Sequence, residues 1–327
     1  MRRQRRGARV PAGAPGQPLN TAAFVLNPAR VRGAARVAAR CAAAAETAGW
    51  DGVLLETTAG EPGTELARAA VGAGARLVFA VGGDGTVRAC AAALAGTMVP
   101  LAIVPRGTAN LAARALGIPA RLDAALACGF GGHERRIDLA SADGITFAAM
   151  AGLGMDATVV GATPARLKTG AGWLAYAAAG AWHAHGRHTA FAISLDGTLL
   201  EISARSVVVG NAGLLPGGFT LLPAARLDDG LLDVGILAPS SPLGWGVVGY
   251  RVLTASRRDD RRLARYRARR VEIHADRDLP RQVDGEVIEP GRSLTVTVLP
   301  AALLVRVPGP APVRVAGPAL AGMPGPA

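Results

Sequence analysis

The stretch RLVFAVGGDGTVRACAAALAGTMVPLAIVPRGTAN, at residues 76–110, decides the fold of this chain. An apolar run at 77–81 predicts a buried strand, and the alanine-rich segment at 87–94 predicts a helix. The turn GGDGT at 82–86 joins them, and a second apolar run at 100–104 leads into the loop PRGTAN. The order is strand, tight loop, helix and strand, which is typical of an α/β domain.

The turn at 82–86 has the composition of an anion site. Glycine has no Cβ, so the backbone bends sharply there and its N–H groups can approach a ligand closely. The first turn of the following helix adds unpaired amides and the positive end of the helix dipole, which favour a phosphate. For a glycine pair alone, an ordinary strand-to-helix turn is the alternative. Asp84 favours the functional interpretation, because a carboxylate among such donors is costly unless a cation or a transferable proton is involved.

Strands alternate with helices from residue 21 to about residue 134. The expected strands are 22–26, 52–55, 77–81 and 100–104, and the expected helices are 34–48, 63–71 and 87–94. This alternation predicts a mainly parallel, doubly wound sheet with helices on both faces. In open α/β sheets, ligands bind at the carboxyl ends of the strands. The polar residues at those ends are Asn27, Thr57, Thr58, Asp84, Thr86, Thr108 and Asn110.

Past residue 135 the pattern changes to short apolar runs separated by turns, which is typical of an antiparallel β domain. The expected strands are 137–139, 145–149, 190–195, 206–210, 232–237, 271–274 and 294–299, and the expected helices are 173–183 and about 243–267. We therefore expect four regions. They are a disordered basic tail at 1–20, a nucleotide-binding α/β domain at 21–134, a β-rich domain at 135–307 and a disordered Pro- and Gly-rich tail at 308–327.

The length of 327 residues, half of them hydrophobic, suits two domains with separate cores. No apolar run reaches the roughly 18–20 residues that a membrane span needs, so we do not expect an integral membrane protein. The arginine-rich start is followed by Pro and Gly rather than by an apolar core, which predicts a cytoplasmic protein without a secretory signal. Cys41, Cys90 and Cys128 lack metal-ligand spacing and are expected to be reduced, buried thiols.

The net charge of +12 is concentrated in two segments. The first twenty residues carry five arginines and no acidic residue, a net +5. Residues 251–270 carry nine arginines against Asp259 and Asp260, a net +7, so the remainder of the chain sums to zero. Such a concentration predicts an anionic surface as a partner. Compositional drift is the alternative for part of the excess, because Lys168 is the only lysine and arginine is abundant throughout.

Seven motifs, taken in order, resemble the diacylglycerol kinase catalytic-domain family, the bacterial lipid kinases that are also related to sphingosine kinases. The motifs are NP at 27–28, TT at 57–58, GGDGT at 82–86, GTAN at 107–110, GN at 210–211, LDDG at 227–230 and DGE at 284–286. The resemblance covers nearly all of residues 21–307. It implies a nucleotide site between an N-terminal α/β domain and a C-terminal antiparallel β-sandwich domain that receives the lipid substrate.

The resemblance also implies roles for single residues. ATP would contact Asn27, Thr58, Gly82, Gly83, Asp84, Gly85, Thr86, Gly107, Thr108 and Asn110. The Asp84 carboxylate would serve the catalytic Mg²⁺ or the phosphates. A further Mg²⁺ would bind Asp229 and the backbone carbonyls of Arg226 and Leu231, with Asp138 joining through a water molecule. For the LDDG motif alone a plain hairpin turn is the alternative, and the two interpretations are compatible.

Asp284 and Glu286 would place two carboxylates on one face if their segment is extended. One of them would accept the proton of an attacking hydroxyl in phosphoryl transfer, and the sequence does not choose between them. A solvent-exposed loop is the alternative for this motif. Three departures from the family pattern leave the acceptor preference open: Ala29 and Arg30 after the NP motif, Leu111 after GTAN, and Met150 with Ala151 before Gly152.

We therefore expect an enzyme that transfers the γ-phosphoryl group of ATP to a lipid hydroxyl, with diacylglycerol as the first candidate acceptor. The acceptor must be drawn from a membrane. Trp245, Tyr250 and the arginines of 251–270 would dock the protein on the anionic inner membrane surface as a peripheral protein, and a solvated basic helix is the alternative.

Two other functions stay open at this point. A NAD kinase is the enzymatic alternative, because that related group also uses a GGDG loop. The other alternative is a non-catalytic basic module that binds membrane or nucleic acid. The aromatic content of 4%, with no stacking platform, argues against nucleic acid. The sequence does not decide whether the protein is a homodimer.

Overall fold

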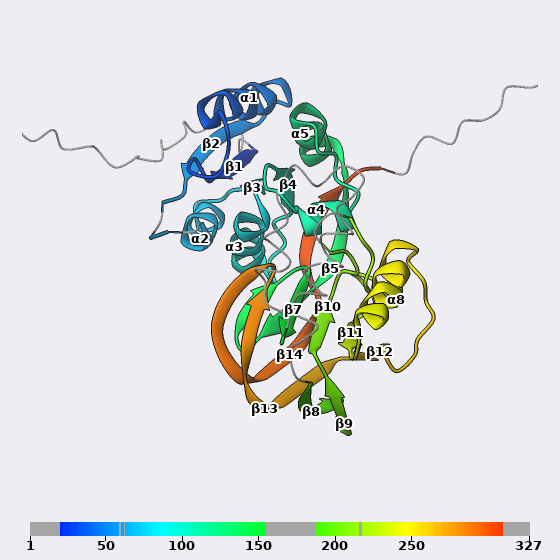
Figure 1. The fold of residues 1–327 in the computed structure, drawn as a ribbon. Coiled ribbons are helices and arrows are strands. Elements are labelled where there is room, and N and C mark those ends of the chain that lie inside the picture. The colour runs from blue at the N-terminus through cyan, green and yellow to red at the C-terminus, as the bar shows by residue number, and fades with distance from the viewer. Residues whose placement is uncertain (1–19, 59, 62, 155–187, 216–217, 310–327) are drawn as a thin grey trace, which may run out of the picture.

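The computed structural model describes residues 20–58, 60–61, 63–154, 188–215 and 218–309. The helix expected at 173–183 and nearly all of the tails expected at 1–20 and 308–327 lie outside these residues. The described strands belong to one sheet of 14 strands, which runs through both halves of the molecule (Figure 1).

The N-terminal half is a parallel sheet with helices on both faces. Its strands are β1 (Thr21–Leu26), β2 (Asp51–Glu56), β3 (Leu77–Gly82) and β4 (Leu101–Pro105), in the order β2-β1-β3-β4. The helices pack in pairs, α1 (Ala34–Thr47) beside α5 (Leu122–Gly131) and α2 (Thr64–Gly72) beside α3 (Asp84–Leu94) (Figure 1). The prediction of a doubly wound α/β arrangement is confirmed.

Continuous apolar runs give the central strands of this sheet. Every residue of β3 and of β4 is buried, as expected for parallel strands that are covered on both faces. Phe24 of β1 stacks on Phe79 of β3 with ring centroids 4.6 Å apart, and Phe130 of α5 lies 4.8 Å from Phe79. These rings fix α5 against the sheet.

The C-terminal half is an antiparallel, β-sandwich-like domain, as predicted. Its strands are β5 (His133–Ala142), β6 (Ile145–Phe147), β7 (Met150–Leu153), β8 (Thr189–Leu195), β9 (Thr198–Ala204), β10 (Ser206–Gly210), β11 (Leu232–Leu237), β12 (Leu263–Ala268), β13 (Arg270–Val283) and β14 (Glu286–Val307). The long strand β14 pairs antiparallel with β13 and β5, and then reaches the N-terminal sheet, where Val305 pairs in parallel with Leu101 of β4. The two halves are therefore joined through the sheet as well as through the chain.

The predicted helix at 243–267 is wrong in its second half. The helix α8 covers only Pro242–Leu253, and Ala255, with φ of 48°, ends it in a left-handed conformation. The chain then returns as β12, which pairs antiparallel with β11. The change from helix to strand is difficult to predict from this arginine-rich sequence, because long arginine side chains suit an exposed helix and an exposed strand alike.

Smaller differences concern the bounds of one helix and several elements that were not predicted. Helix α3 begins at Asp84 rather than at residue 87, so only Gly83 lies between β3 and α3. The short helix α4 (Leu111–Ala115) and the helix α5 were not predicted, and neither were the strands β7, β9 and β12.

Two expectations from composition can be compared with the described residues. None of the described helices is long and apolar enough to cross a membrane. The three cysteines are free thiols, with Cys41 and Cys90 buried and Cys128 partly buried. Burial raises the pKa of both buried thiols to about 12, which makes them unreactive near neutral pH.

Candidate active site

The four parallel strands end level with one another, and their loops are linked by backbone hydrogen bonds. Leu26 pairs with Glu56 and with Val81, and Gly82 pairs with Pro105. Beyond the strands, the Thr57 amide donates to the Leu26 carbonyl at 2.8 Å, and the Arg106 amide donates to the Gly82 carbonyl at 2.8 Å. The order β2-β1-β3 reverses direction at β1, so a topological switch point lies between the Asn27 and Gly82 loops.

The loops after β3 and β4 touch backbone to backbone, because both contain glycine at the contact. A Cβ on Gly83 would lie 3.1 Å from the Cα of Gly107, and a Cβ on Gly107 would overlap the Cα of Gly83. Thr86 occupies the space beside Gly82 in the same way. Gly82, Gly83 and Gly107 are therefore required by packing, in addition to any role toward a ligand.

Asp84 joins these two loops. Its carboxylate accepts hydrogen bonds from the amides of Asn110, at 2.8 Å, and Leu111, at 2.6 Å. Burial raises the pKa of Asp84, and these amide hydrogen bonds oppose the rise. Asn110, with φ of 48°, closes its own loop through side-chain hydrogen bonds of 2.9 Å to the amide and the carbonyl of Gly107. The carboxylate thus caps the start of α4.

The other predicted ATP contacts lie around this edge. Asn27 follows β1 and accepts a hydrogen bond from the Arg30 amide through Oδ1 at 3.2 Å. Thr57 is buried against Gly63, whereas Thr58 is exposed and bridges to Glu61. Thr108 is exposed beyond β4. All of these groups lie at one edge of the sheet, as the strand ends predicted.

Asp284 is enclosed at the turn between β13 and β14. Its side chain is buried, with only 8% of the residue exposed, and it accepts hydrogen bonds from the amides of Ala148, Ala149 and Met150 at 2.9–3.1 Å. Burial raises its pKa to about 6, against the amide hydrogen bonds, and the nearby negative charge of Asp84 adds to the rise. This coupling places the two aspartates in one electrostatic environment.

Glu286 reaches the glycine turn of the N-terminal half. A Cβ on Gly85 would lie 2.8 Å from Oε1 of Glu286, and the other oxygen, Oε2, forms an ion pair with Arg88 of α3. Arg88 also donates to the Val283 carbonyl at 3.1 Å. The Glu286 side chain is 57% exposed, in contrast to Asp284. The structure therefore brings the two distant motifs GGDGT and DGE into contact.

The predicted metal turn, residues 226–231, is built around Asp138. Both oxygens of this buried carboxylate accept amide hydrogen bonds of 2.7 Å, one from Gly230 and one from Ala301. Asp229 pairs with Arg267, and its Oδ1 accepts from the Leu231 amide at 3.2 Å. Within the described ranges, no cluster of three or more His, Cys, Asp or Glu side chains could hold a metal ion.

These donors fit a hard cation only in part. The carboxylate of Asp229 and the carbonyls of Arg226 and Leu231 are oxygens, which Mg²⁺ prefers. However, Arg267 holds the Asp229 carboxylate, so the guanidinium would have to turn away for a cation to bind. Asp138 is held by backbone amides that cannot turn away.

Two family models match the chain. The diacylglycerol kinase catalytic domain matches residues 21–142, and the YegS C-terminal NAD kinase beta sandwich-like domain matches residues 149–307. The chain belongs to the lipid kinase family that shares the diacylglycerol kinase catalytic domain. The expected resemblance is thereby confirmed.

Relatives of this lipid kinase family match over much of the chain. "Probable lipid kinase YegS-like" of Pseudomonas aeruginosa is 36% identical over 210 residues, which are 62% of this chain and 67% of the relative. "Probable lipid kinase YegS" of Salmonella arizonae is 30% identical over 212 residues, with the same coverage. A solved diacylglycerol kinase structure from Bacillus anthracis superposes with a TM-score of 0.70 at 21% identity, over 89% of this chain and 98% of that one, and this likeness shows the fold.

Two residues that hold the site together, Arg88 and Asn211, were not assigned a role from the sequence. For Arg88, the sequence signal is its position four residues after Asp84, which places both side chains on the same face of α3. Asn211, quoted only as part of the GN motif, is fully buried and donates to the carbonyls of Asp138, at 2.8 Å, and Ala148, at 3.1 Å. It therefore links the segments that hold Asp138 and Asp284.

Proposed function

We propose that this protein transfers the γ-phosphoryl group of ATP to a lipid hydroxyl, with diacylglycerol as the acceptor. The observation that carries the proposal is the position of Glu286, whose carboxylate lies against Gly85 of the phosphate loop. An acid–base group from one half of the chain thus meets an anion-binding turn from the other half. This is the arrangement that phosphoryl transfer between two bound substrates requires.

The nucleotide would bind at the switch point between the β1 and β3 loops. The first-turn amides of α3, at residues 84–86, have no partner within the helix and would face the phosphates, aided by the helix dipole. Asn27, Thr58 and Thr108 would complete the ATP site at the same sheet edge. The proposal places Asp84, Gly107 and Asn110 behind this surface, where they hold the two glycine loops together.

We assign the role of general base to Glu286. The lipid hydroxyl oxygen would attack the γ-phosphorus, the bond to the β–γ bridging oxygen would break, and ADP would leave. The hydroxyl proton would pass to the Glu286 carboxylate, which is exposed and faces the turn. Asp284 is a poorer base for this step, because three backbone amides occupy its oxygens. We assign it the role of holding residues 148–150 in place.

Magnesium enters in two places. Bound together with ATP, it would neutralise charge on the phosphates. A second ion would be held by Asp229 and the carbonyls of Arg226 and Leu231, after Arg267 releases the carboxylate, with Asp138 reached through water. This second ion would stabilise the turn at 226–231, and no step of the transfer depends on it. We further propose a peripheral location at the cytoplasmic face of the membrane, where the lipid acceptor resides.

The test uses purified protein, labelled ATP and detergent-dispersed acceptors: diacylglycerol, sphingosine, ceramide, phosphatidylglycerol and, separately, NAD. We expect labelled phosphatidic acid as the product. Glu286→Gln should lower kcat by about 10²- to 10⁴-fold, the usual contribution of a general base. Glu289→Gln, an exposed residue three positions along the same strand, is the matched control and should leave kcat unchanged.

Two outcomes would change the assignment. Phosphorylation of NAD with no lipid product would replace the lipid kinase by the NAD kinase alternative. A Glu286→Gln protein with the wild-type kcat would show that the base lies elsewhere.

A further inference from the structure

Helix α8 exposes an apolar face. Leu243, Tyr250 and Leu253 are 80%, 66% and 41% exposed, and their spacing of seven and three residues places them on the same side of the helix. Gly246 and Val247 lie between them, so this face carries no charged side chain. Exposed apolar groups that adjoin one another mark an interaction surface rather than a solvated helix face.

The opposite face of α8 is packed. Val248 is buried in a small core with Met150, Leu222 and Leu263, and Trp245 packs against the same core. Trp245 therefore belongs to the interior side of the helix, and the expectation that it faces a membrane is wrong. Tyr250 remains on the outer face, and Leu243 and Leu253 join it there.

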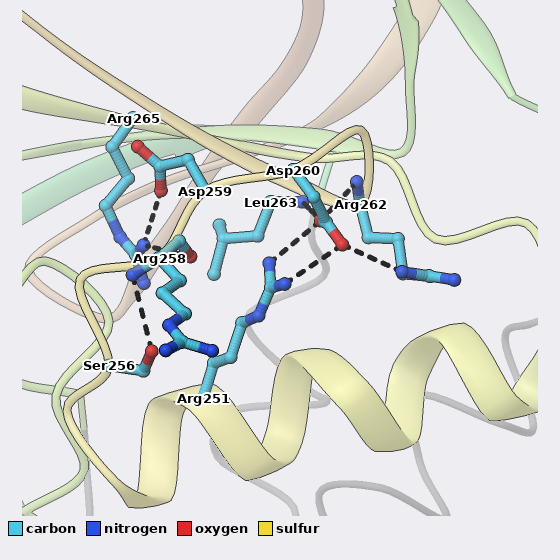
Figure 2. A network of polar contacts seen from close by, with 8 residues as sticks. All are labelled: Arg251, Ser256, Arg258, Asp259, Asp260, Arg262, Leu263 and Arg265. Carbon is cyan, nitrogen blue, oxygen red and sulfur yellow. Dashed lines mark hydrogen bonds and ion pairs between the residues drawn. The ribbon is translucent and has the colours of Figure 1, made fainter.

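The loop after α8 is fastened to the helix by ion pairs, as Figure 2 shows. Arg251 of α8 binds Asp260 at 2.8 Å, and Arg262 binds the same carboxylate at 2.7 Å. Arg265 binds Asp259 at 2.6 Å. Partial burial alone would raise the pKa of Asp260. The hydrogen bonds from the Arg262 amide and from the guanidinium groups of Arg251 and Arg262 outweigh burial and hold this pKa well below its usual range. The Asp260 carboxylate therefore stays ionised, and able to pair with both arginines, well into the acidic range.

These ion pairs use both acidic residues of the loop. Arg257, Arg258 and Arg261 are exposed and form no ion pair within the part of the chain that the structure describes. Three positive charges therefore lie in the loop that begins where the apolar face of α8 ends. We call Leu243, Tyr250, Leu253, Arg257, Arg258 and Arg261 together the α8 surface.

We propose that the α8 surface docks onto an anionic lipid bilayer, with Leu243, Tyr250 and Leu253 entering the interface and the three arginines binding lipid headgroups. This inference rests on the proposed function, since the acceptor is a membrane lipid. An amphipathic helix with adjacent cations has the chemistry of interfacial binding, and tyrosine suits the headgroup region. A second copy of the chain fits less well, because a twofold contact would bring like-charged arginines together.

The buried face of α8 is also connected to the active site. Val248 and Met150 share one core. The Met150 amide donates a hydrogen bond to the Asp284 carboxylate, and the Met150 carbonyl accepts one from the Asp284 amide. Helix α8 therefore packs on the same core as the segment that holds Asp284.

The experiment measures co-sedimentation with vesicles of phosphatidylcholine alone and of phosphatidylcholine mixed with phosphatidylglycerol. Arg257→Gln, Arg258→Gln and Arg261→Gln combined should weaken binding to the mixed vesicles by roughly 100-fold, since each arginine near such a surface contributes about fivefold. Leu243→Ser with Tyr250→Ser should weaken it by more than about tenfold. Both variants should keep the wild-type Tm, because the changed side chains are exposed.

Matched controls change the same residue types elsewhere. Leu199→Ser alters a side chain that is 64% exposed on β9, and Arg32→Gln, Arg36→Gln and Arg76→Gln together remove the same charge from the N-terminal half. Neither control should change vesicle binding. Wild-type protein that ignores the mixed vesicles, or α8 variants that bind them as wild type does, would overturn the proposal. Loss of a dimer in sedimentation velocity, with vesicle binding unchanged, would make the surface a self-interface and would also overturn it.

Activity separates this inference from the proposed function. The α8 variants should phosphorylate detergent-dispersed diacylglycerol at the wild-type rate and vesicle-embedded diacylglycerol at least tenfold more slowly. If wild type binds anionic vesicles but phosphorylates no lipid in detergent, the kinase assignment fails while docking stands.

Discussion

Replacing Gly107 by alanine tests whether the contact between the two glycine loops builds the nucleotide site. The new Cβ would lie 2.9 Å from Oδ1 of Asn110 and would overlap the Cα of Gly83. A normal carbon–carbon contact needs about 3.5–4.0 Å, so the loops would have to separate by roughly 1 Å. That displacement would also stretch the hydrogen bonds from Asn110 and Leu111 to Asp84, which are 2.8 and 2.6 Å long.

Both stability and catalysis should respond. Overpacking of a tight contact costs about 1–3 kcal/mol, which corresponds to a fall in Tm of several degrees for a chain of this size. A displacement of about 1 Å between groups that position a substrate costs about 100-fold in rate. We therefore expect kcat/KM for ATP to fall by roughly 100-fold in Gly107→Ala, measured with detergent-dispersed diacylglycerol at saturation.

The matched control is Gly72→Ala at the end of α2, where a Cβ would have no neighbour within 4 Å. It should keep the wild-type kcat/KM and gain up to about 1 kcal/mol of stability, because alanine loses less backbone entropy than glycine. The reasoning is refuted if Gly107→Ala keeps both the Tm and the KM for ATP of wild type. A fall in Tm with unchanged kinetics would limit the contact to a folding role.

Two further predictions concern buried carboxyls. Asp284 has a folded pKa of about 6 against an ordinary value of 3.8, so it contributes stability that is complete below about pH 3.8 and is lost as the pH rises through 6. Each pKa unit corresponds to about 1.4 kcal/mol of stability. In urea unfolding between pH 3.5 and 8, the free energy of unfolding of wild type should therefore fall by about 3 kcal/mol relative to that of Asp284→Asn. Parallel pH profiles for the two proteins would contradict this. Asp138→Ala should cost about 2–4 kcal/mol, because it leaves the amides of Gly230 and Ala301 without their acceptor. Asp228→Ala is the control, because Asp228 is partly exposed and paired with Arg135 and Arg226, and it should cost less than about 1 kcal/mol of stability. Equal losses of stability in the two variants would show that the Asp138 hydrogen bonds contribute little.

The sequence predicted the parts of the fold that depend on local pattern. Apolar runs bounded by Gly, Pro and Asn located β1 to β4, and the rule that ligands bind at strand ends brought Asn27, Gly82 and Thr108 to one edge. The β12 strand was missed because its alternation is weak: Leu263 and Ala268 are buried, and arginines occupy much of the rest. Only its pairing with β11 makes it a strand.

The candidate site was harder to predict, because its contacts join distant segments. The partners of Asp84 lie in the loop after β4, and those of Asp284 lie more than a hundred residues earlier. The composition of a motif does not reveal such partners. The basic segment shows the same limit: its net charge of +7 was correct as a count, but the sequence did not show that Asp259 and Asp260 would be paired with Arg251, Arg262 and Arg265.

The partners of the motif carboxylates divide them into two kinds. Asp84, Asp138 and Asp284 are each held by backbone amides, which cannot leave without local unfolding. Glu286 is instead paired with the guanidinium group of Arg88, a side chain that can rotate away. Asp229 accepts one amide hydrogen bond, from Leu231, through Oδ1, and its other oxygen is paired with the guanidinium group of Arg267. A group that must accept a proton or a cation needs a partner that can be exchanged. In the mechanism that we propose, the fixed carboxylates hold the loops in place, and the exchangeable pairs lie where the chemistry and the ion binding would occur.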